Sequence, residues 1–312
     1  MKSSDSLISL RAPAKINLFL HVLDRQPDGY HRVFSLTQMV GLYDQVHVRR
    51  IPARKGIRLS VTGLPVPEGE DNLMVQAALA YLHRFDLKGG LEIKLHKQIP
   101  LSAGLGGGSS DAAATLAALG RLWSFKPPPV ELMTLARFIG SDVPFFLSGP
   151  SGLVCATGEE VHPIRLVGEG WVVLVRVNIP VSTAQVYQRL DETRAKQGRQ
   201  GPAPHEKLWL TLAENQNKIT AGLRSTFQLA KLPPYLHNDL ERIAVETYPV
   251  ISAIKRQLRR LRAAGVLMSG SGPTVFGLFL HLEKAQRAAQ TLRQEHKDWE
   301  VWVVKVLKRR PF

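Results

Sequence analysis

Residues 100–110, which read PLSAGLGGGSS, are the densest group in this chain that could do chemistry. Their glycines can bring the backbone close to an anion and turn its N–H groups toward it. An alanine-rich helical pattern follows, and the first turn of a helix adds unpaired N–H groups and the positive end of its dipole. The segment therefore predicts a phosphate-binding loop, with the hydroxyls of Ser109 and Ser110 as further donors.

Three common nucleotide-binding loops do not fit this segment. A Walker A loop ends in Gly-Lys-Ser/Thr, and no lysine follows these glycines. A dinucleotide fingerprint needs glycine where Ser109 stands and an acidic residue about 20 positions later, but residues 112–130 contain no Asp or Glu. The lysine and HRD segments of a protein kinase are also missing. A turn without a ligand is the remaining alternative, and the density of glycine and serine argues against it.

Asp142 and Lys15 are the titratable residues in unusual sequence surroundings. Asp142 lies in a turn (GSDVPFF) before an apolar segment, where it could be a catalytic base or a helix N-cap. Lys15 lies within an apolar strand pattern, where a lysine that extends to the surface is the ordinary alternative to a functional one. The residues alone leave both alternatives open.

Three sequence blocks, in this order, resemble the signatures of the GHMP kinases, the superfamily of galacto-, homoserine, mevalonate and phosphomevalonate kinases. The blocks are residues 12–18 (APAKINL), 100–110 and 269–276 (SGSGPTVF). Further matches are similar to the branch whose acceptor is a methylerythritol linked to cytidine diphosphate, and they are residues 28–31 (DGYH), 71–73 (DNL), 140–144 (GSDVP) and 238–239 (ND). The resemblance spans nearly the whole chain and is weakest around residues 191–207.

The resemblance implies that the protein transfers the γ-phosphoryl group of ATP, with Mg²⁺, to the 2-hydroxyl of that acceptor in the non-mevalonate isoprenoid route. It implies Asp142 as the catalytic base and Lys15 beside it. Because the sequence shows no carboxylate cluster for Mg²⁺, Ser110 is the candidate single protein ligand. The expected ATP-binding residues are Pro100, Leu101, Ser102, Ala103, Gly104, Leu105, Gly106, Gly107, Gly108, Ser109 and Ser110.

The acceptor half should recognise a pyrimidine. Tyr30 and Tyr187 are expected to stack on the base, and His31 is expected to read its edge by hydrogen bonds. Asn17 is expected to contact the polyol or the phosphates. Tyr187 could instead be an ordinary amphipathic core residue. The glycines of residues 269–273 could let that loop approach the glycine-rich loop or the substrate, or could simply form a tight turn between strands.

These residues need an α+β scaffold to position them. By resemblance it has two domains: residues 1–165, ribosomal-S5-domain-2-like, and 166–312, a ferredoxin-like α/β sandwich. Alternation predicts a strand pair or bent strand over 7–24 and strands over 45–50, 57–62, 91–95, 153–166, 171–179 and 301–307, with a strand–loop–strand at 266–280. Helices are expected from residue 72 to about 85, after the glycine loop to about Trp123, and over 130–139 and 283–296. Residues 191–207 are expected to form a polar surface insertion.

Composition narrows the class of protein. The chain has 312 residues, 44% of them apolar and 21% charged, the proportions of a soluble globular protein. No run is apolar enough for a membrane helix and the N-terminus does not resemble a signal peptide, so a cytoplasmic location without membrane partners is expected. The single cysteine, Cys155, is expected to be a small buried residue.

The net charge of +15 indicates anionic ligands. A nucleic-acid-binding protein is the alternative class, but it leaves the glycine loop, Lys15 and Asp142 unexplained. We expect no nucleic-acid partner and read the basic cluster at residues 255–262 as a solvated helix face. A monomer or weak homodimer is expected.

Overall fold

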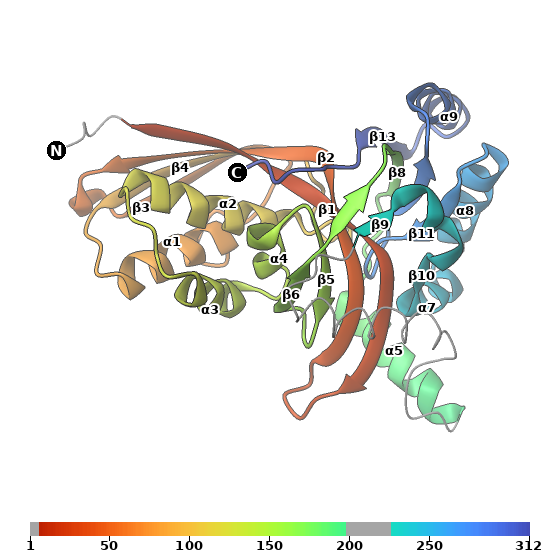
Figure 1. Cartoon of the computed structure of the whole chain (residues 1–312), viewed down its shortest axis with the longest axis horizontal. Helices are drawn as coiled ribbons and strands as arrows, with labels where there is room; N and C mark the ends of the chain where they lie inside the picture. Colours follow the sequence, from red (N-terminus) through yellow and green to blue (C-terminus); the bar gives the residue numbers. More distant parts are fainter. Residues whose placement is uncertain (1–5, 198–225) are drawn as a thin grey trace.

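The computed structural model describes residues 6–197 and 226–312, which form two main β-sheets with helices packed against them (Figure 1). The larger sheet has the order β10-β1-β2-β4-β3, and β5 and β6 extend from β2. Its strands are β1 (Leu7–Arg25), β2 (His31–Ile51), β3 (Ile57–Gly63), β4 (Gly90–Lys97), β5 (Ser151–Cys155), β6 (Glu160–Pro163) and β10 (His237–Asn238). The smaller sheet has the order β11-β12-β8-β13 and consists of β8 (Trp171–Val177), β11 (Gly265–Met268), β12 (Val275–Phe279) and β13 (Trp299–Lys305). The short strands β7 (Arg165–Val167) and β9 (Thr226–Gln228) pair with each other.

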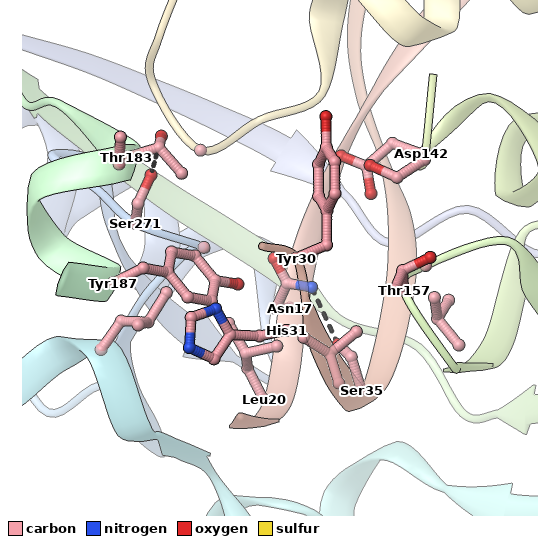
Figure 2. A pocket seen from close by; sticks show the side chains of 18 of the residues that line it. Asn17, Leu20, Tyr30, His31, Ser35, Asp142, Thr157, Thr183, Tyr187 and Ser271 are labelled. Atoms are coloured by element: carbon pink, nitrogen blue, oxygen red, sulfur yellow. Dashed lines mark hydrogen bonds between the residues drawn. The ribbon is translucent and has the colours of Figure 1, made fainter. Parts of the chain in front are cut away.

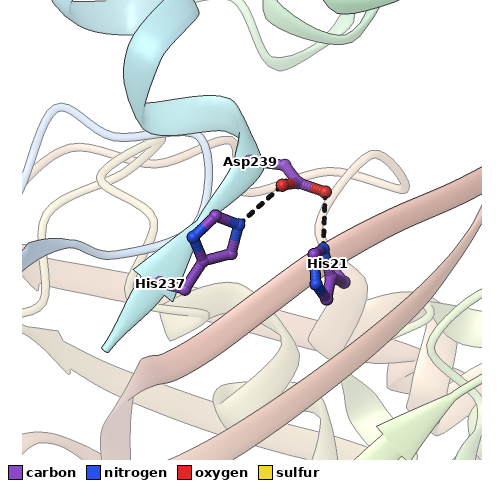
Figure 3. A group of neighbouring side chains, drawn as sticks. All are labelled: His21, His237 and Asp239. Carbon is purple, nitrogen blue, oxygen red and sulfur yellow. Dashed lines mark hydrogen bonds and ion pairs between the residues drawn. The ribbon is translucent and has the colours of Figure 1, made fainter. Parts of the chain in front are cut away.

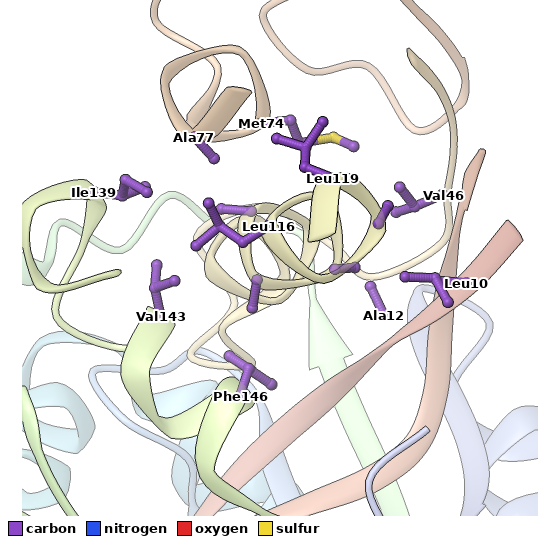
Figure 4. Close-up of a cluster of buried hydrophobic side chains, with 14 of the residues drawn as sticks. Leu10, Ala12, Val46, Met74, Ala77, Leu116, Leu119, Ile139, Val143 and Phe146 are labelled. Atoms are coloured by element: carbon purple, nitrogen blue, oxygen red, sulfur yellow. The ribbon is translucent and has the colours of Figure 1, made fainter. Parts of the chain in front are cut away.

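Helices cover one face of the larger sheet, and others pack on the smaller sheet (Figure 1). The first group is α1 (Leu73–Arg84), α2 (Gly107–Leu122), α3 (Pro129–Ile139) and α4 (Val143–Ser148). Figure 4 shows how Met74 and Leu116 from these helices share a core with Leu10 and Val46 from the sheet. The second group is α7 (Asp239–Thr247), α8 (Pro249–Arg260) and α9 (Leu282–Glu295), while α5 (Thr183–Lys196) packs beside α7. Short 3-10 turns are η1 (Ala53–Lys55), η2 (Leu229–Lys231) and η3 (Pro233–Tyr235).

The antiparallel pair β1–β2 is the part of the fold that the sequence predicted least well. The opening segment is one bent strand, with register shifts between Pro13 and Ala14 and between Asn17 and Phe19. Its partner β2 starts at His31, whereas alternation predicted a strand only over residues 45–50. Residues 34–40 are buried on both faces of the sheet, so the period of two that marks a half-buried strand is missing there.

The helix predictions are largely confirmed. Asn72 caps α1, because its side-chain oxygen accepts a hydrogen bond from Met74 N at 2.9 Å. The helix α3 ends at Gly140 as expected, although Gly140 has extended backbone rather than the left-handed conformation typical of a C-terminal glycine. The predicted surface insertion over residues 191–207 was wrong at its start, because residues 191–196 continue α5; residues 198–207 lie outside the described residues.

The end of the chain returns to the larger sheet. Leu307 N donates to Met39 O at 3.1 Å, and Phe312 packs in the same core as Leu10. The larger sheet also takes β10 from the second half of the sequence. Cys155 is buried as expected, and burial raises the pKa of its thiol to about 11. In the described ranges, no helix is both long and apolar enough to cross a membrane.

Candidate active site

The glycine-rich segment connects the end of β4 to the start of α2, which begins at Gly107. Gly104 and Gly106 have φ angles of +73° and +67°, a region that side chains disfavour. A Cβ on Gly104 would lie 2.0 Å from Ser269 O, and a Cβ on Gly106 would lie 2.9 Å from Lys15 Cγ. These glycines therefore let the loop contact both Lys15 and residues 269–273, the SGSGP segment. The three sequence blocks thus meet in space.

The SGSGP segment is a tight connection between β11 and β12 that contacts the glycine loop. Gly270 has a φ of +56°, and a Cβ there would lie 3.3 Å from Gly104 Cα. Ser269 Oγ donates to Gly104 O at 2.8 Å. The glycines therefore form a tight turn between two strands, and this turn also brings the segment against the glycine-rich loop. The two alternatives from the sequence do not exclude each other.

Lys15 and Asp142 meet next to the glycine loop. Lys15 Nζ lies 3.5 Å from Asp142 Oδ2, and the backbone N–H of Lys15 donates to Leu105 O at 2.9 Å. Lys15 is only 6% exposed, so it is not a surface lysine. Asp142 immediately precedes α4, but its side chain makes no capping hydrogen bond and instead lines a cavity. The structure thus brings this pair together as the resemblance implied.

Asn17 links the lysine to the sheet. Its Oδ1 accepts from Lys15 Nζ at 2.8 Å, and its Nδ2 donates to Thr37 Oγ1 at 3.3 Å. The same Nδ2 donates to Ser35 Oγ at 2.8 Å (Figure 2). Alternation places Lys15, Asn17 and their partners on the same face of β1 and β2. Asn17 also lines the cavity. Because its amide oxygen accepts from Lys15 and its amide nitrogen is held by the sheet, Asn17 orients Lys15.

A buried ion cluster, which the sequence analysis missed, joins the two ends of the glycine loop. Lys97 Nζ at the end of β4 donates to Asp111 Oδ2 on α2 at 2.7 Å and also to Asp44 Oδ2 on β2. Asp44 Oδ1 accepts from the backbone N–H groups of Gln98 and Ile99 at 2.6 and 2.8 Å. Burial raises the pKa of Asp111 well above its usual value. The sequence contained one sign of this cluster, because the charged residue Asp111 interrupts an otherwise alanine-rich helical segment.

The three residues that are expected to bind the pyrimidine differ in their contacts and in their exposure. The rings of His31 and Tyr187 lie 5.0 Å apart between centroids and are inclined at 38°, side by side in Figure 2. Tyr30 is 67% exposed on the turn before β2. Burial, together with the negative charges of Asp142 and Asp239, raises the pKa of the Tyr187 phenol.

Two further pairs that the sequence analysis missed also line the cavity. His31 Nε2 lies 2.8 Å from Asp191 Oδ1, and Thr183 Oγ1 lies 2.7 Å from Ser271 Oγ. Asp191 stands four residues after Tyr187 on α5, one helical turn away. That spacing was visible in the sequence once residues 183–196 are recognised as helix.

One continuous cavity of about 880 Å³ joins the Lys15–Asp142 pair to the aromatic residues. Lys15, Asp142 and Gly106 line it, and so do His31 and Tyr187, which lie on the opposite side of the view from Asp142 in Figure 2. The volume is in the range of small-molecule and cofactor sites. The pattern of an anion-binding loop, an ion pair and an aromatic recess in one cavity suits transfer between a phosphorylated donor and a nucleoside-containing acceptor.

Ser110 fits the role of a single metal ligand only in part. Its Oγ is fully buried and has no hydrogen-bond partner among the described residues, so one oxygen donor is unused. Mg²⁺ usually keeps several waters and binds largely through substrate phosphates, so a single hydroxyl is compatible with it. Asp111, the adjacent carboxylate, is already paired with Lys97.

A cluster of potential metal ligands, formed by His21, His237 and Asp239, is held together by hydrogen bonds to the Asp239 carboxylate (Figure 3). Asp239 accepts hydrogen bonds from His21 Nδ1 at 3.0 Å and His237 Nε2 at 2.7 Å, and also from Val22 N and Arg194 Nη2. Burial acts to raise the pKa of Asp239, but the hydrogen bonds from both histidines outweigh it and hold the pKa below its usual value. Because Arg194 already places a positive charge on this carboxylate, a metal ion would be repelled there.

The fold is that of the GHMP kinases. Residues 72–150 match the family GHMP kinases N terminal domain, and residues 225–298 match GHMP kinases C terminal. A homoserine kinase from Cytophaga hutchinsonii shares the fold, with a TM-score of 0.73 at 22% identity over 100% of this chain and 98% of its own.

More similar relatives narrow the family. The chain is 40% identical to a 4-diphosphocytidyl-2-C-methyl-D-erythritol kinase of Geobacter metallireducens, over 96% of this chain and 99% of that protein. It is also 40% identical to the protein of the same name from Bacillus velezensis, over 91% and 92% of the two chains. A crystal structure of 4-(cytidine 5'-diphospho)-2C-methyl-D-erythritol kinase superposes with a TM-score of 0.74 at 35% identity, covering 96% and 99%. The chain therefore belongs to the family of 4-diphosphocytidyl-2-C-methyl-D-erythritol kinases.

Proposed function

We propose that this protein transfers the γ-phosphoryl group of ATP to the 2-hydroxyl of 4-diphosphocytidyl-2-C-methyl-D-erythritol. The observation that carries the proposal is the Lys15–Asp142 pair, which stands between the glycine loop and the aromatic recess of one cavity. The names of the relatives at 40% identity support the choice of acceptor.

Asp142 is the proposed base. Phosphoryl transfer asks little covalent chemistry of the protein, so the site must mainly align the hydroxyl with the phosphorus and remove its proton. Asp142 projects into the cavity without a capping bond, which leaves its oxygens available to accept that proton. The buried Lys15 ammonium, fixed by Asn17, holds the carboxylate in place by charge attraction.

The donor half is the loop over residues 100–110 with the N-terminal turn of α2. Its backbone N–H groups and the hydroxyls of Ser102, Ser109 and Ser110 are the proposed phosphate contacts. Mg²⁺ bound with ATP would neutralise phosphate charge, and Ser110 is its proposed protein ligand.

The acceptor half is the recess around Tyr30, His31 and Tyr187. We propose that the pyrimidine stacks on Tyr187 and that exposed Tyr30 closes over its other face, while His31 contacts the base edge. We propose a division of the chain near residue 165 into two domains that share the cavity, and a single chain or weak homodimer as the working form.

The test measures ADP release by the purified protein with Mg²⁺-ATP and each of three acceptors: 4-diphosphocytidyl-2-C-methyl-D-erythritol, homoserine and mevalonate. We expect ADP release that depends on the first acceptor alone. Release with homoserine or mevalonate, and none with the cytidyl acceptor, would overturn the proposal.

A further inference from the structure

The helix α5 presents two residues to His31 from consecutive turns. Tyr187 lies against the imidazole ring, and Asp191, four residues later, reaches one of its ring nitrogens. The side chain of His31 is only 6% exposed and that of Asp191 is 33% exposed. Both residues line the cavity, so their contact is part of the wall of the recess.

This contact determines which ring nitrogen carries the proton in neutral His31. A carboxylate can only accept, so Nε2, at 2.8 Å from Asp191 Oδ1, must be the nitrogen that bears hydrogen. Nδ1 of the neutral ring is then an acceptor. In the part of the chain that the structure describes, Nδ1 has no hydrogen-bond partner, so it is the ring nitrogen left for a ligand.

We infer that Asp191 is a positioning residue that makes His31 Nδ1 an acceptor and thereby selects cytosine over uracil. The inference rests on the proposed cytidyl acceptor and goes beyond it by assigning the residue that sets base specificity. Cytosine presents a donor amino group at C4, whereas uracil presents an acceptor oxygen at the same place. When Nδ1 is an acceptor, it can receive a hydrogen bond from the amino group of cytosine. In uracil, the oxygen at the same place would put a second acceptor opposite Nδ1, and no hydrogen bond would form.

The position of α5 is held independently of this contact. Arg194, on the next turn, donates to Val22 O at 2.8 Å and to Asp239 Oδ2 at 3.1 Å. The helix therefore remains attached to β1 and α7 when the charge of Asp191 is removed. A substitution at Asp191 should accordingly change the imidazole and leave Tyr187 in place.

The experiment compares Asp191→Asn with Asp191→Glu and with the matched control Glu192→Gln. Glu192 is an exposed neighbour on α5 whose side chain accepts from Gln188 and does not contact His31. The measured quantity is the ratio of kcat/KM for the cytidine-linked acceptor to that for the uridine-linked acceptor, at saturating Mg²⁺-ATP. ¹⁵N spectra of histidine-labelled protein, with the His31 signals assigned by their loss in His31→Gln, report which nitrogen is protonated.

We expect Asp191→Asn to lower the ratio roughly ten- to hundredfold, chiefly through KM of the cytidine-linked acceptor, because an amide can donate to Nε2 and move the proton to Nδ1. Asp191→Glu should restore most of the ratio, and Glu192→Gln should leave it unchanged. The spectra should show unprotonated Nδ1 in the neutral imidazole of the parent protein and protonated Nδ1 in Asp191→Asn.

The outcomes separate this inference from the proposed function. If the parent protein turns over both acceptors equally well, or if Asp191→Asn keeps the ratio, the kinase activity stands and the role of Asp191 is overturned. A protonated Nδ1 in the neutral imidazole of the parent protein also overturns it. No turnover with the cytidine-linked acceptor removes the proposed function, and the cytosine-selecting role falls with it.

Discussion

Asp142 and Lys15 illustrate how single side chains acquire a role from their surroundings. In the sequence, each had an ordinary alternative, as a helix cap or as a surface lysine. In the structure, Lys15 is buried and hydrogen-bonded to Asn17, and Asp142 makes no capping bond. A buried ammonium needs a partner, and the partners that this one has are Asn17 and a carboxylate that faces the cavity.

Substituting Asp142→Asn should abolish most of the turnover while ATP still binds. The amide cannot accept the hydroxyl proton as a carboxylate does, so kcat should fall by about 10²–10⁴-fold. Steady-state kinetics gives kcat, and calorimetric titration with ATP gives nucleotide affinity. Glu68→Gln, an exposed substitution that removes the same charge, is the control and should have the activity of the parent. Full turnover in Asp142→Asn would exclude Asp142 as the base.

Asp239→Asn should reduce stability near neutral pH and matter less in acid. A carboxylate whose pKa is lowered by folding contributes stability above its pKa in the unfolded chain, about 3.9, and loses it as the pH falls toward the lower folded value. Removing a buried paired charge should cost about 3 kcal/mol at pH 7.

The check is urea unfolding of the parent and Asp239→Asn between pH 3 and pH 7, in which the difference in the free energy of unfolding should shrink below about pH 4. Asp24→Asn, which loses an exposed ion pair with Arg32, is the control and should change stability by less than about 1 kcal/mol. A difference that is constant over this pH range would show that the charge of Asp239 is not what stabilises the cluster.

At the level of elements, the glycine loop depends on what holds its two ends and its middle. The Asp44–Lys97–Asp111 cluster joins β2, β4 and α2, so it fixes the strand before the loop and the helix after it. The middle of the loop touches the connection between β11 and β12 through Gly104 and Ser269. The conformation of the loop therefore depends on these contacts with neighbouring elements as well as on its own glycines.

Gly104→Ala and Gly108→Ala should have opposite effects on stability. A Cβ at Gly104 would lie 2.0 Å from a backbone oxygen at a φ of +73°, so the substitution should cost more than about 2 kcal/mol. A Cβ at Gly108, inside α2, meets only Leu73 Cδ1 at 3.7 Å, and alanine is the better helix former by about 1 kcal/mol. Urea denaturation measures both. Equal effects would show that the contact with Ser269 does not constrain the loop.

At the level of the whole molecule, the cavity brings together a donor end and an acceptor end from distant parts of the chain. The loop and Asp142 come from the first half of the sequence, and Tyr187 and Ser271 come from the second. The basic helix α8 contributes no residue to the cavity, and its apolar residues Ile251, Ile254 and Leu258 are buried. Two of its basic side chains are paired, Lys255 with Glu241 and Arg260 with Glu295.

Tyr187→Ala should weaken one substrate and leave the other unchanged. Loss of stacking on one base is worth about 1–3 kcal/mol, which raises KM for the cytidine-linked acceptor roughly 5- to 150-fold. KM for ATP should stay within twofold, because Tyr187 is not part of the proposed donor half. Tyr235→Ala, an exposed tyrosine outside this cavity, is the control. An unchanged KM for the acceptor would argue against stacking.

Local patterns were sufficient to predict much of the fold. Alternation and capping placed α1, α2, α3 and most strands, because half-buried elements have a residue period and helix ends need particular side chains. The first part of β2 escaped prediction, since both of its faces are covered and no period remains. The helix α5 was not predicted: residues 183–190 were assigned to no element and residues 191–196 to a surface insertion, because most of this helix is polar and buries only Val186 and Leu190.

The sequence by itself indicated a phosphate-binding loop over residues 100–110, because glycines and serines are dense in one short motif. Lys15, Asp142, Tyr30 and His31 stood out only because their motifs resemble those of a known family. Only the tertiary structure decided what those residues touch. The pair formed by His31 and Asp191 joins residues 160 positions apart, and the Asp239 cluster joins β1 to α5 and α7. Such contacts depend on how strands and helices pack, and no local period or motif encodes that packing.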